Sequence, residues 1–180
     1  MIVLGIETAT ELVGVALADP DGPRAAVWAT GRRRHAESLA PAIAHVLDQA
    51  GLTLQQVDAV AVDLGPGLFT GLRVGVATAK GLAQGMGLGL LGLASTEVLA
   101  AAAYRTGHRG PVIAVVDGRR SEVFAARYAS DGDGVAFTEV SAPSRYTPEA
   151  LAAELSAAIR AGGPEGGWLA VGDGAHRYAD

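Results

Sequence analysis

The stretch from Asp58 to Gly75 constrains the fold of this 180-residue chain more than any other. Residues 58–64 are mostly apolar and predict a buried strand, and the glycine–proline–glycine run at 65–67 turns the chain sharply into a helix that begins near Thr70. Backbone amides at such a turn can hold an anion. The Gly-Lys-Ser/Thr ending of a phosphate-binding P-loop is missing, however. We therefore favour a tight turn with Thr70 capping the helix.

The helix after this turn is apolar on most sides. Gly71, Gly75 and Ala79 recur every four residues, a spacing that lets another helix approach closely. Since a surface helix needs only one apolar stripe, this helix is either buried inside the domain or meets another subunit on one side. We favour the subunit contact, because a chain of this length has few layers that could cover both sides.

Composition excludes several classes of protein. Cysteine is absent, which excludes disulfide frameworks, thiolate metal sites and cysteine nucleophiles. The chain is 49% hydrophobic and 18% charged, as in a domain with a large core, and its net charge of -5 argues against non-specific nucleic-acid binding by the whole surface. No basic segment precedes Glu7, and Thr96 with Glu97 interrupts the apolar stretch at 85–103. We predict neither a signal peptide nor a membrane span, and we expect a cytoplasmic protein.

The order of elements indicates an α/β fold. Three strands at 2–7, 12–18 and 24–30 predict an antiparallel meander, which a helix at 38–51 follows. Meander, helix, strand and helix in this order resemble one lobe of the ribonuclease-H-like fold of actin, Hsp70 and sugar kinases. No internal repeat is evident. The remaining segments are predicted as strands at 87–93, 111–117, 121–129, 134–140 and 168–172 and helices at 95–105 and 147–161. We divide the chain into an N-terminal lobe over 1–105 and a reduced C-terminal lobe over 106–180.

Acidic residues at strand ends are candidates for nucleotide chemistry. Glu7 and Asp63 end two neighbouring predicted strands and could bind a metal–nucleotide, or could serve only in turns. Asp117 and the glycine after it match the start of the phosphate loop in actin-fold ATPases, but two arginines follow where glycines would let the backbone approach phosphate. A hairpin turn is the alternative. The segment at 172–174 likewise resembles a glycine-rich adenosine loop.

Basic and histidine side chains give weaker signals. Arg32, Arg33 and Arg34 precede the first helix, where they oppose its dipole, and they could meet an acidic partner, RNA phosphate or only solvent. His35 and His45 lie ten residues apart, outside any metal-binding pattern, so we predict no histidine metal site.

Four segments together resemble the TsaB (YeaZ) family. They are the runs at 6–10, 34–41, 65–82 and 116–124, and the glycine–proline run is highly specific in this combination. Glu7 stands where the family usually has Asp, Leu68 stands where it usually has Ser, and the chain stops some tens of residues sooner than the family leads us to expect. The motif residues are His35, Glu37, Gly65, Pro66, Gly67, Phe69, Thr70, Arg73, Lys80, Asp117, Arg119, Arg120 and Glu122.

The resemblance implies a non-catalytic subunit in the formation of threonylcarbamoyladenosine in tRNA. In the family, TsaB docks on the catalytic subunit TsaD through helices of its N-terminal lobe, the ATPase TsaE joins them, and isolated TsaB forms a homodimer through the same surface. Carried to this sequence, the partner interface comprises Leu39, Ile43, Val46, Gly71, Leu72, Gly75, Val76, Ala79 and Leu82.

The resemblance implies no cofactor bound by this chain alone, and it leaves open a nucleotide at the partner interface and direct contact with tRNA. Two other hypotheses remain. One is a small actin-fold ATPase or kinase that uses Glu7, Asp63 and Asp117 around a metal–nucleotide. The other is a glycoprotease-like metallopeptidase, which the lack of metal-binding histidines disfavours.

Overall fold

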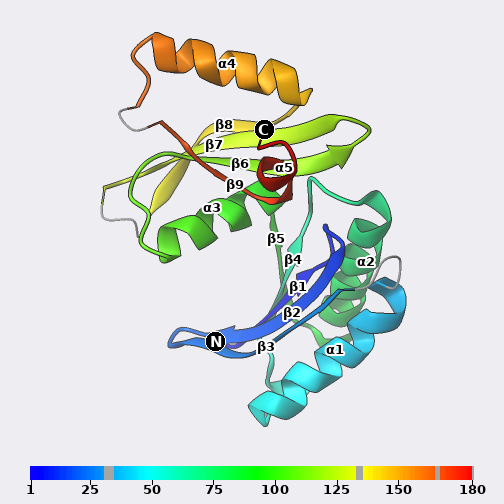
Figure 1. Cartoon of the computed structure of the whole chain (residues 1–180). Coiled ribbons are helices and arrows are strands. Elements are labelled where there is room, and N and C mark those ends of the chain that lie inside the picture. The colour runs from blue at the N-terminus through cyan, green and yellow to red at the C-terminus, as the bar shows by residue number, and fades with distance from the viewer. Residues whose placement is uncertain (31–34, 133–135, 165–166, 180) are drawn as a thin grey trace. The chain divides into compact units, whose positions relative to one another are not determined.

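The computed structural model describes all residues except 31–34, 133–135, 165–166 and 180. The chain divides into two compact units, Met1–Ala94 and Ser95–Asp180 (Figure 1). We predicted this boundary after residue 105. It lies earlier because helix α3 (Ser95–Arg105) buries Ala100, Ala103 and Tyr104 against strands of the second unit. The arginine run at 32–34 lies outside the described residues.

Unit 1 is a five-stranded sheet in the order β3-β2-β1-β4-β5. The first three strands form an antiparallel meander, and the last two run parallel to β1. A meander extended by parallel strands on the far side of β1 is the topology of the ribonuclease-H-like fold, so the predicted fold class is confirmed. The strands are β1 (Val3–Glu7), β2 (Leu12–Asp19), β3 (Gly22–Thr30), β4 (Ala59–Asp63) and β5 (Gly89–Leu93).

Two helices and the sheet enclose the core of unit 1. Alternate side chains of β1, β2 and β4 pack against α1 (His35–Ala50) and α2 (Phe69–Met86), as the period of two along a strand requires. A short 3-10 helix, η1 (Leu54–Gln56), leads into β4. The largest fully buried side chains here are Leu4, Leu17 and Leu39. Burying each of them stabilises the fold by about 1.5–3 kcal/mol.

Helix α1 begins three residues before the predicted position, at His35. A helix that began at Ser38 would hold Pro41 in its first turn, but in the structure Pro41 lies inside the helix. Proline has no N–H, so α1 lacks one backbone hydrogen bond at this position. Pro41 is exposed and takes no part in the core of unit 1.

The four described strands of unit 2 repeat the topology of the first four strands of unit 1. Its sheet has the order β8-β7-β6-β9, in which β6 (Val112–Arg119), β7 (Glu122–Ser130) and β8 (Phe137–Tyr146) form a meander. Helix α4 (Pro148–Arg160) follows, then β9 (Leu169–Val171) parallel to β6, then the short α5 (Asp173–Arg177). The strand predicted at 134–140 corresponds to β8, which begins later, and α5 was not predicted. No helix among the described residues is long and apolar enough to cross a membrane.

The position of Leu39 in the core yields a test. Leu39 is 1% exposed and packs in the unit 1 core, so Leu39→Ala should lower the free energy of unfolding by about 2–5 kcal/mol. Its exposed neighbour Ala40 is the matched control, because Ala40→Ser should cost no more than about 0.7 kcal/mol of helix propensity. Urea unfolding followed by circular dichroism measures both. Equal effects would place Leu39 outside the core.

Candidate functional site

The motif residues of unit 1 converge on the turn between β1 and β2. The Leu68 N–H donates to the Ala9 carbonyl over 2.6 Å, and the Thr8 hydroxyl donates to the Gly71 carbonyl over 2.9 Å. Thr8 is fully buried. The Gly65–Pro66 peptide bond that opens this loop is cis. The conspicuous glycine–proline motif thus fastens the start of α2 onto the first turn of the chain.

Glycine is required in α2 because the helix lies directly on that turn. A Cβ atom at Gly67 would lie 2.3 Å from the Ala9 carbonyl oxygen, and one at Gly71 would lie 2.0 Å from the Thr8 carbonyl oxygen. A Cβ at Gly75 would lie 2.2 Å from the Thr8 hydroxyl oxygen. The close approach that we predicted for a partner helix is therefore made to unit 1 itself.

The buried His35 has a structural role at the start of α1. Its Nε2 lies 2.9 Å from the Thr10 carbonyl oxygen and must donate to it, because a carbonyl only accepts. Glu37, two residues further along α1, is exposed. Both α1 and α2 are therefore anchored to the same β1–β2 turn.

The predicted partner interface needs correction. Leu39, Ile43 and Val46 are 0–8% exposed and belong to the unit 1 core, and Gly71, Gly75 and Ala79 are buried against the sheet or its turn. These six positions are closed to a partner, because unit 1 already fills the space around them. The other three, Leu72, Val76 and Leu82, are half-buried.

The exposed side of α2 carries a different set of residues. Phe69 is 64% exposed, and the Arg73 guanidinium carbon stands 3.9 Å from the centre of its ring. A second stripe of small residues lies on this side, and a Cβ atom at Gly81 or Gly85 would meet nothing within 4 Å. Thr70 and Lys80 are exposed as well. The prediction that Thr70 caps the helix is wrong, because α2 begins at Phe69 and its N-cap is Leu68, which makes no side-chain cap bond. We define the outer helix face as the exposed residues Ala40 and Ala44 of α1 with Phe69, Arg73, Ala77, Lys80, Gly81 and Gly85 of α2.

Two carboxyl groups meet where β1 and β4 end. Glu7 accepts hydrogen bonds from the N–H groups of Ala9 (2.6 Å) and Thr10 (3.2 Å), and Asp63 accepts one from Gly65 (2.6 Å). Burial, then a hydrogen bond to Asp63 and repulsion by its charge, raises the pKa of Glu7 to about 9. At neutral pH Glu7 therefore keeps its proton and shares it with Asp63. Within the described residues, no group of three or more His, Asp or Glu side chains could hold a metal ion.

In unit 2, Asp117 is committed to its neighbours. Its carboxylate accepts from the Arg119 N–H (3.0 Å) and lies 3.3 Å from the Arg119 guanidinium and 3.5 Å from that of Arg177. Arg119, Arg120 and Ser121 all have positive φ angles in the tight turn from β6 to β7. The predicted hairpin turn is thus confirmed. Glu122 after the turn pairs with Arg145 of β8 over 3.2 Å.

The glycines proposed for an adenosine loop serve close packing. A Cβ at Gly172 would lie 2.3 Å from the Val115 carbonyl oxygen, and one at Gly174 would lie 2.9 Å from the Val115 side chain. The Asp173 carboxylate accepts the Asp117 N–H over 3.0 Å. Helix α5 is therefore pressed against β6, much as α2 is pressed against the end of β1.

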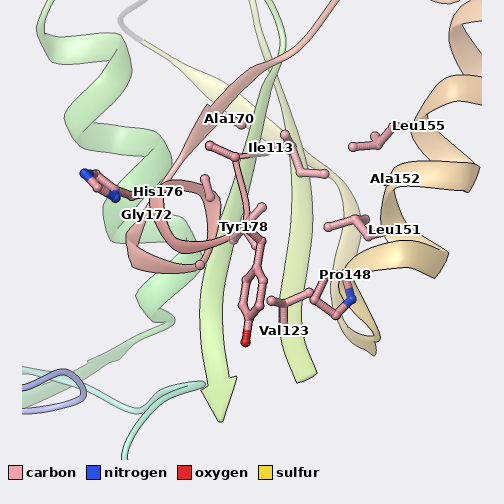
Figure 2. Close-up of a pocket in the computed structure, with 14 residues that line it drawn as sticks. Ile113, Val123, Pro148, Leu151, Ala152, Leu155, Ala170, Gly172, His176 and Tyr178 are labelled. Carbon is pink, nitrogen blue, oxygen red and sulfur yellow. The ribbon is translucent and has the colours of Figure 1, made fainter. Parts of the chain in front are cut away.

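An apolar pocket of about 570 Å³ lies beside α5, between the sheet of unit 2 and α4 (Figure 2). Leu151 and Leu155 of α4 point toward Ile113 and Val123 of the sheet. Its lining is almost entirely aliphatic and holds no pair of charged groups that could do chemistry: Ile113, Val115, Val123, Pro148, Leu151, Ala152, Leu155, Ala170, Gly172, Gly174, Ala175, His176, Tyr178 and Ala179.

Known proteins match this geometry. A family model described as TsaD, tRNA N6-adenosine threonylcarbamoyltransferase, matches residues 29–161. The solved structure of YeaZ from Pseudomonas aeruginosa is 32% identical and has a TM-score of 0.70, with 82% of this chain and 68% of that chain covered. The chain belongs to the TsaB (YeaZ) family. The resemblance of the sequence motifs is therefore confirmed.

Curated TsaB relatives extend beyond the matched region. The tRNA threonylcarbamoyladenosine biosynthesis protein TsaB of Escherichia coli is 36% identical over 135 residues, which are 75% of this chain and 58% of that protein. TsaB of Haemophilus influenzae is 36% identical over 124 residues, which are 69% of this chain and 52% of that protein. The chain thus matches a little over half the length of these TsaB relatives.

The two glycine environments of this TsaB-family chain predict opposite effects of one substitution. Gly71→Ala should lower the free energy of unfolding by about 1–3 kcal/mol or more, because the added Cβ meets a backbone carbonyl oxygen at 2.0 Å. Gly81→Ala, in the same helix but open to solvent, should raise it by about 0.5–1 kcal/mol. Thermal or urea unfolding measures the change in the free energy of unfolding for both variants. Changes of the same sign would contradict the close approach at Gly71.

The protonated state of Glu7 predicts a pH dependence. The pKa of Glu7 rises from 4.5 to about 9 on folding, so its contribution to stability is complete below pH 4.5 and is lost as the pH rises toward 9. Glu7→Gln keeps an acceptor for Ala9 and Thr10 and a donor for Asp63 but does not titrate. The melting temperature of wild type relative to this variant should therefore fall steadily from pH 5 to pH 9. A constant difference would show that Glu7 is ionised in the folded protein.

Proposed function

We propose that this TsaB-family chain is a non-catalytic subunit in tRNA N6-threonylcarbamoyladenosine formation and docks on a TsaD-type catalytic subunit through the outer helix face. The exposed Phe69–Arg73 pair is the observation that carries the proposal. Aromatic and arginine side chains are enriched in the energetic centres of protein interfaces. The adjoining small residues Ala77, Gly81 and Gly85 allow a partner's backbone to come close.

The interactions that the acidic residues make within the chain support the non-catalytic role. Glu7 holds a proton against Asp63, and Asp117 is neutralised by two guanidinium groups. Neither arrangement leaves a free carboxylate to act as a base or to bind a metal–nucleotide. The ATPase or kinase hypothesis makes a separate expectation, micromolar binding of ATP with magnesium by the isolated chain, which calorimetry measures.

The charge of the outer helix face indicates the kind of surface it meets. Arg73 and Lys80 are exposed on it, whereas the chain as a whole carries a net charge of -5. We therefore propose that the TsaD surface in contact is acidic or neutral around an apolar centre, because complementary potentials speed association and select the partner.

The remaining partners follow from the same proposal. A TsaE-type ATPase joins the complex, and without TsaD the chain pairs with itself through the outer helix face, so that self-association and TsaD binding compete. A nucleotide at the TsaD interface and contact with tRNA belong to the assembled complex. We propose that the complex works in the cytoplasm, where it meets tRNA.

Co-purification with the cognate TsaD tests the docking surface. Phe69→Ala and the charge reversal Arg73→Glu should each weaken binding about tenfold or more, because a central aromatic or arginine anchor is worth roughly 1.4 kcal/mol or more. Arg160→Glu, an exposed reversal at the end of α4, is the matched control and should bind like wild type. Wild type that fails to bind TsaD would refute the role, and equal binding by all three variants would refute the surface.

A further inference from the structure

Strand β5 forms one edge of the unit 1 sheet. It pairs with β4 on one side, and no described strand pairs with its other side. Its sequence is Gly-Leu-Leu-Gly-Leu, without charge or proline. Leu90 is 47% exposed and Leu91 is 54% exposed, and successive residues of a strand point to opposite faces. The edge therefore presents apolar side chains on both faces together with backbone groups that no described strand pairs with.

The other sheet edges among the described strands carry features that block pairing. The opposite edge of the same sheet, β3, contains Pro23 and Arg24, and its pairing with β2 shifts register at Leu17/Ala18. In unit 2, β8 contains Pro143 and Arg145 and pairs irregularly, and β9 has only three residues. Proline, charge, bulges and short length are the devices that protect edges from association. Strand β5 is longer than β9, with five residues, and it contains no proline, no charged residue and no register shift in its pairing with β4.

The hydrogen bonds of β5 identify which backbone groups face outward. The Gly89 N–H donates to Asp58 of the β4 side (3.0 Å), and the Leu93 carbonyl accepts from Leu64 (2.9 Å). Because backbone groups alternate in direction along a strand, those of Leu90 and Gly92 point away from β4. These two residues therefore offer two donors and two acceptors to a neighbouring strand.

The outward groups of β5 complement those of a second β5. In an antiparallel pair centred on Leu91, Leu90 of each copy faces Gly92 of the other, so all four outward groups of each copy are satisfied. Leucine also faces glycine at the Gly89 and Leu93 positions, and only at the centre do two leucines, Leu91 of each copy, face each other as an apolar pair. No charge in the strand repels a second copy. Leu64, 55% exposed, covers the Gly92 position and would contact the incoming Leu90.

We propose that two copies of this chain pair antiparallel through β5 and extend the five-stranded sheet into one of ten strands. Such a contact is isologous, as in most two-fold dimers. It uses none of the residues of the outer helix face and does not depend on the proposed function. Both self-contacts can therefore be tested one at a time.

The absence of cysteine permits a direct test of the register. In the proposed pair the two Leu91 residues face each other without hydrogen bonds, with Cα atoms about 4.5 Å apart, which is within disulfide range. Leu91→Cys should form a disulfide-linked dimer under a mild oxidant. Trp28→Cys, on the protected edge and also exposed, is the matched control and should link much more slowly. Equal rates would overturn the proposal.

Sedimentation equilibrium of the full chain measures the association itself. In the Arg73→Glu background, which weakens self-association through the outer helix face, Leu91→Lys should raise the dissociation constant of the dimer at least tenfold, whereas Trp28→Lys should leave it unchanged. The Arg73→Glu variant separates the two self-contacts, and Leu91→Cys linking should persist in it. A monomeric wild type would overturn the proposal, as would a Leu91→Lys/Arg73→Glu variant that dimerises like Arg73→Glu alone. Loss of TsaD binding by Leu91→Lys with a monomeric wild type would assign the edge to a strand of the partner instead.

Discussion

The contact between Thr8 and the glycine face of α2 organises unit 1. Thr8 is fully buried, its hydroxyl holds the Gly71 carbonyl, and its own carbonyl oxygen occupies the space that a Cβ at Gly71 would need. Since His35 binds the same turn through Thr10, both helices take their positions from three consecutive residues after β1, Thr8, Ala9 and Thr10. Because the Gly71–Gly75–Ala79 side of α2 is buried in this contact, only the opposite side of the helix, the outer helix face, is left exposed.

Sequence reasoning found the fold and the importance of the α2 segment, but it assigned to a partner the side of the helix that unit 1 itself buries. Helix α2 carries two stripes of small residues at four-residue spacing, one from Gly71 to Ala79 and one from Ala77 to Gly85. Periodicity cannot distinguish them, because the choice depends on a turn more than sixty residues away in the chain. The one local signal was Arg73, which continues the Ala77–Gly85 stripe at four-residue spacing, because a charged side chain marks an exposed helix face.

The same limit applies to the acidic motifs. Strand ends placed Glu7 and Asp63 together correctly, because parallel neighbours end at the same edge of a sheet. Whether the two carboxyl groups bind a cation or hold a proton depends on how deeply they are buried and on which N–H groups donate to them. The periodicity of the sequence gives no information about either. The repeated topology of the two units was also invisible in the sequence, since the order of strands is preserved while the residues differ.

The pocket beside α4 implies uneven resistance to opening across the chain. Helix α1 buries His35, Leu39, Ala42, Ile43 and Val46, whereas α4 buries Leu151 alone and faces a pocket along the rest of its inner side. Regions with few buried apolar contacts unfold locally at lower free energy. Amide hydrogens of α4 should therefore exchange with solvent well before those of α1, and a protease that acts through local unfolding should cut α4 before α1.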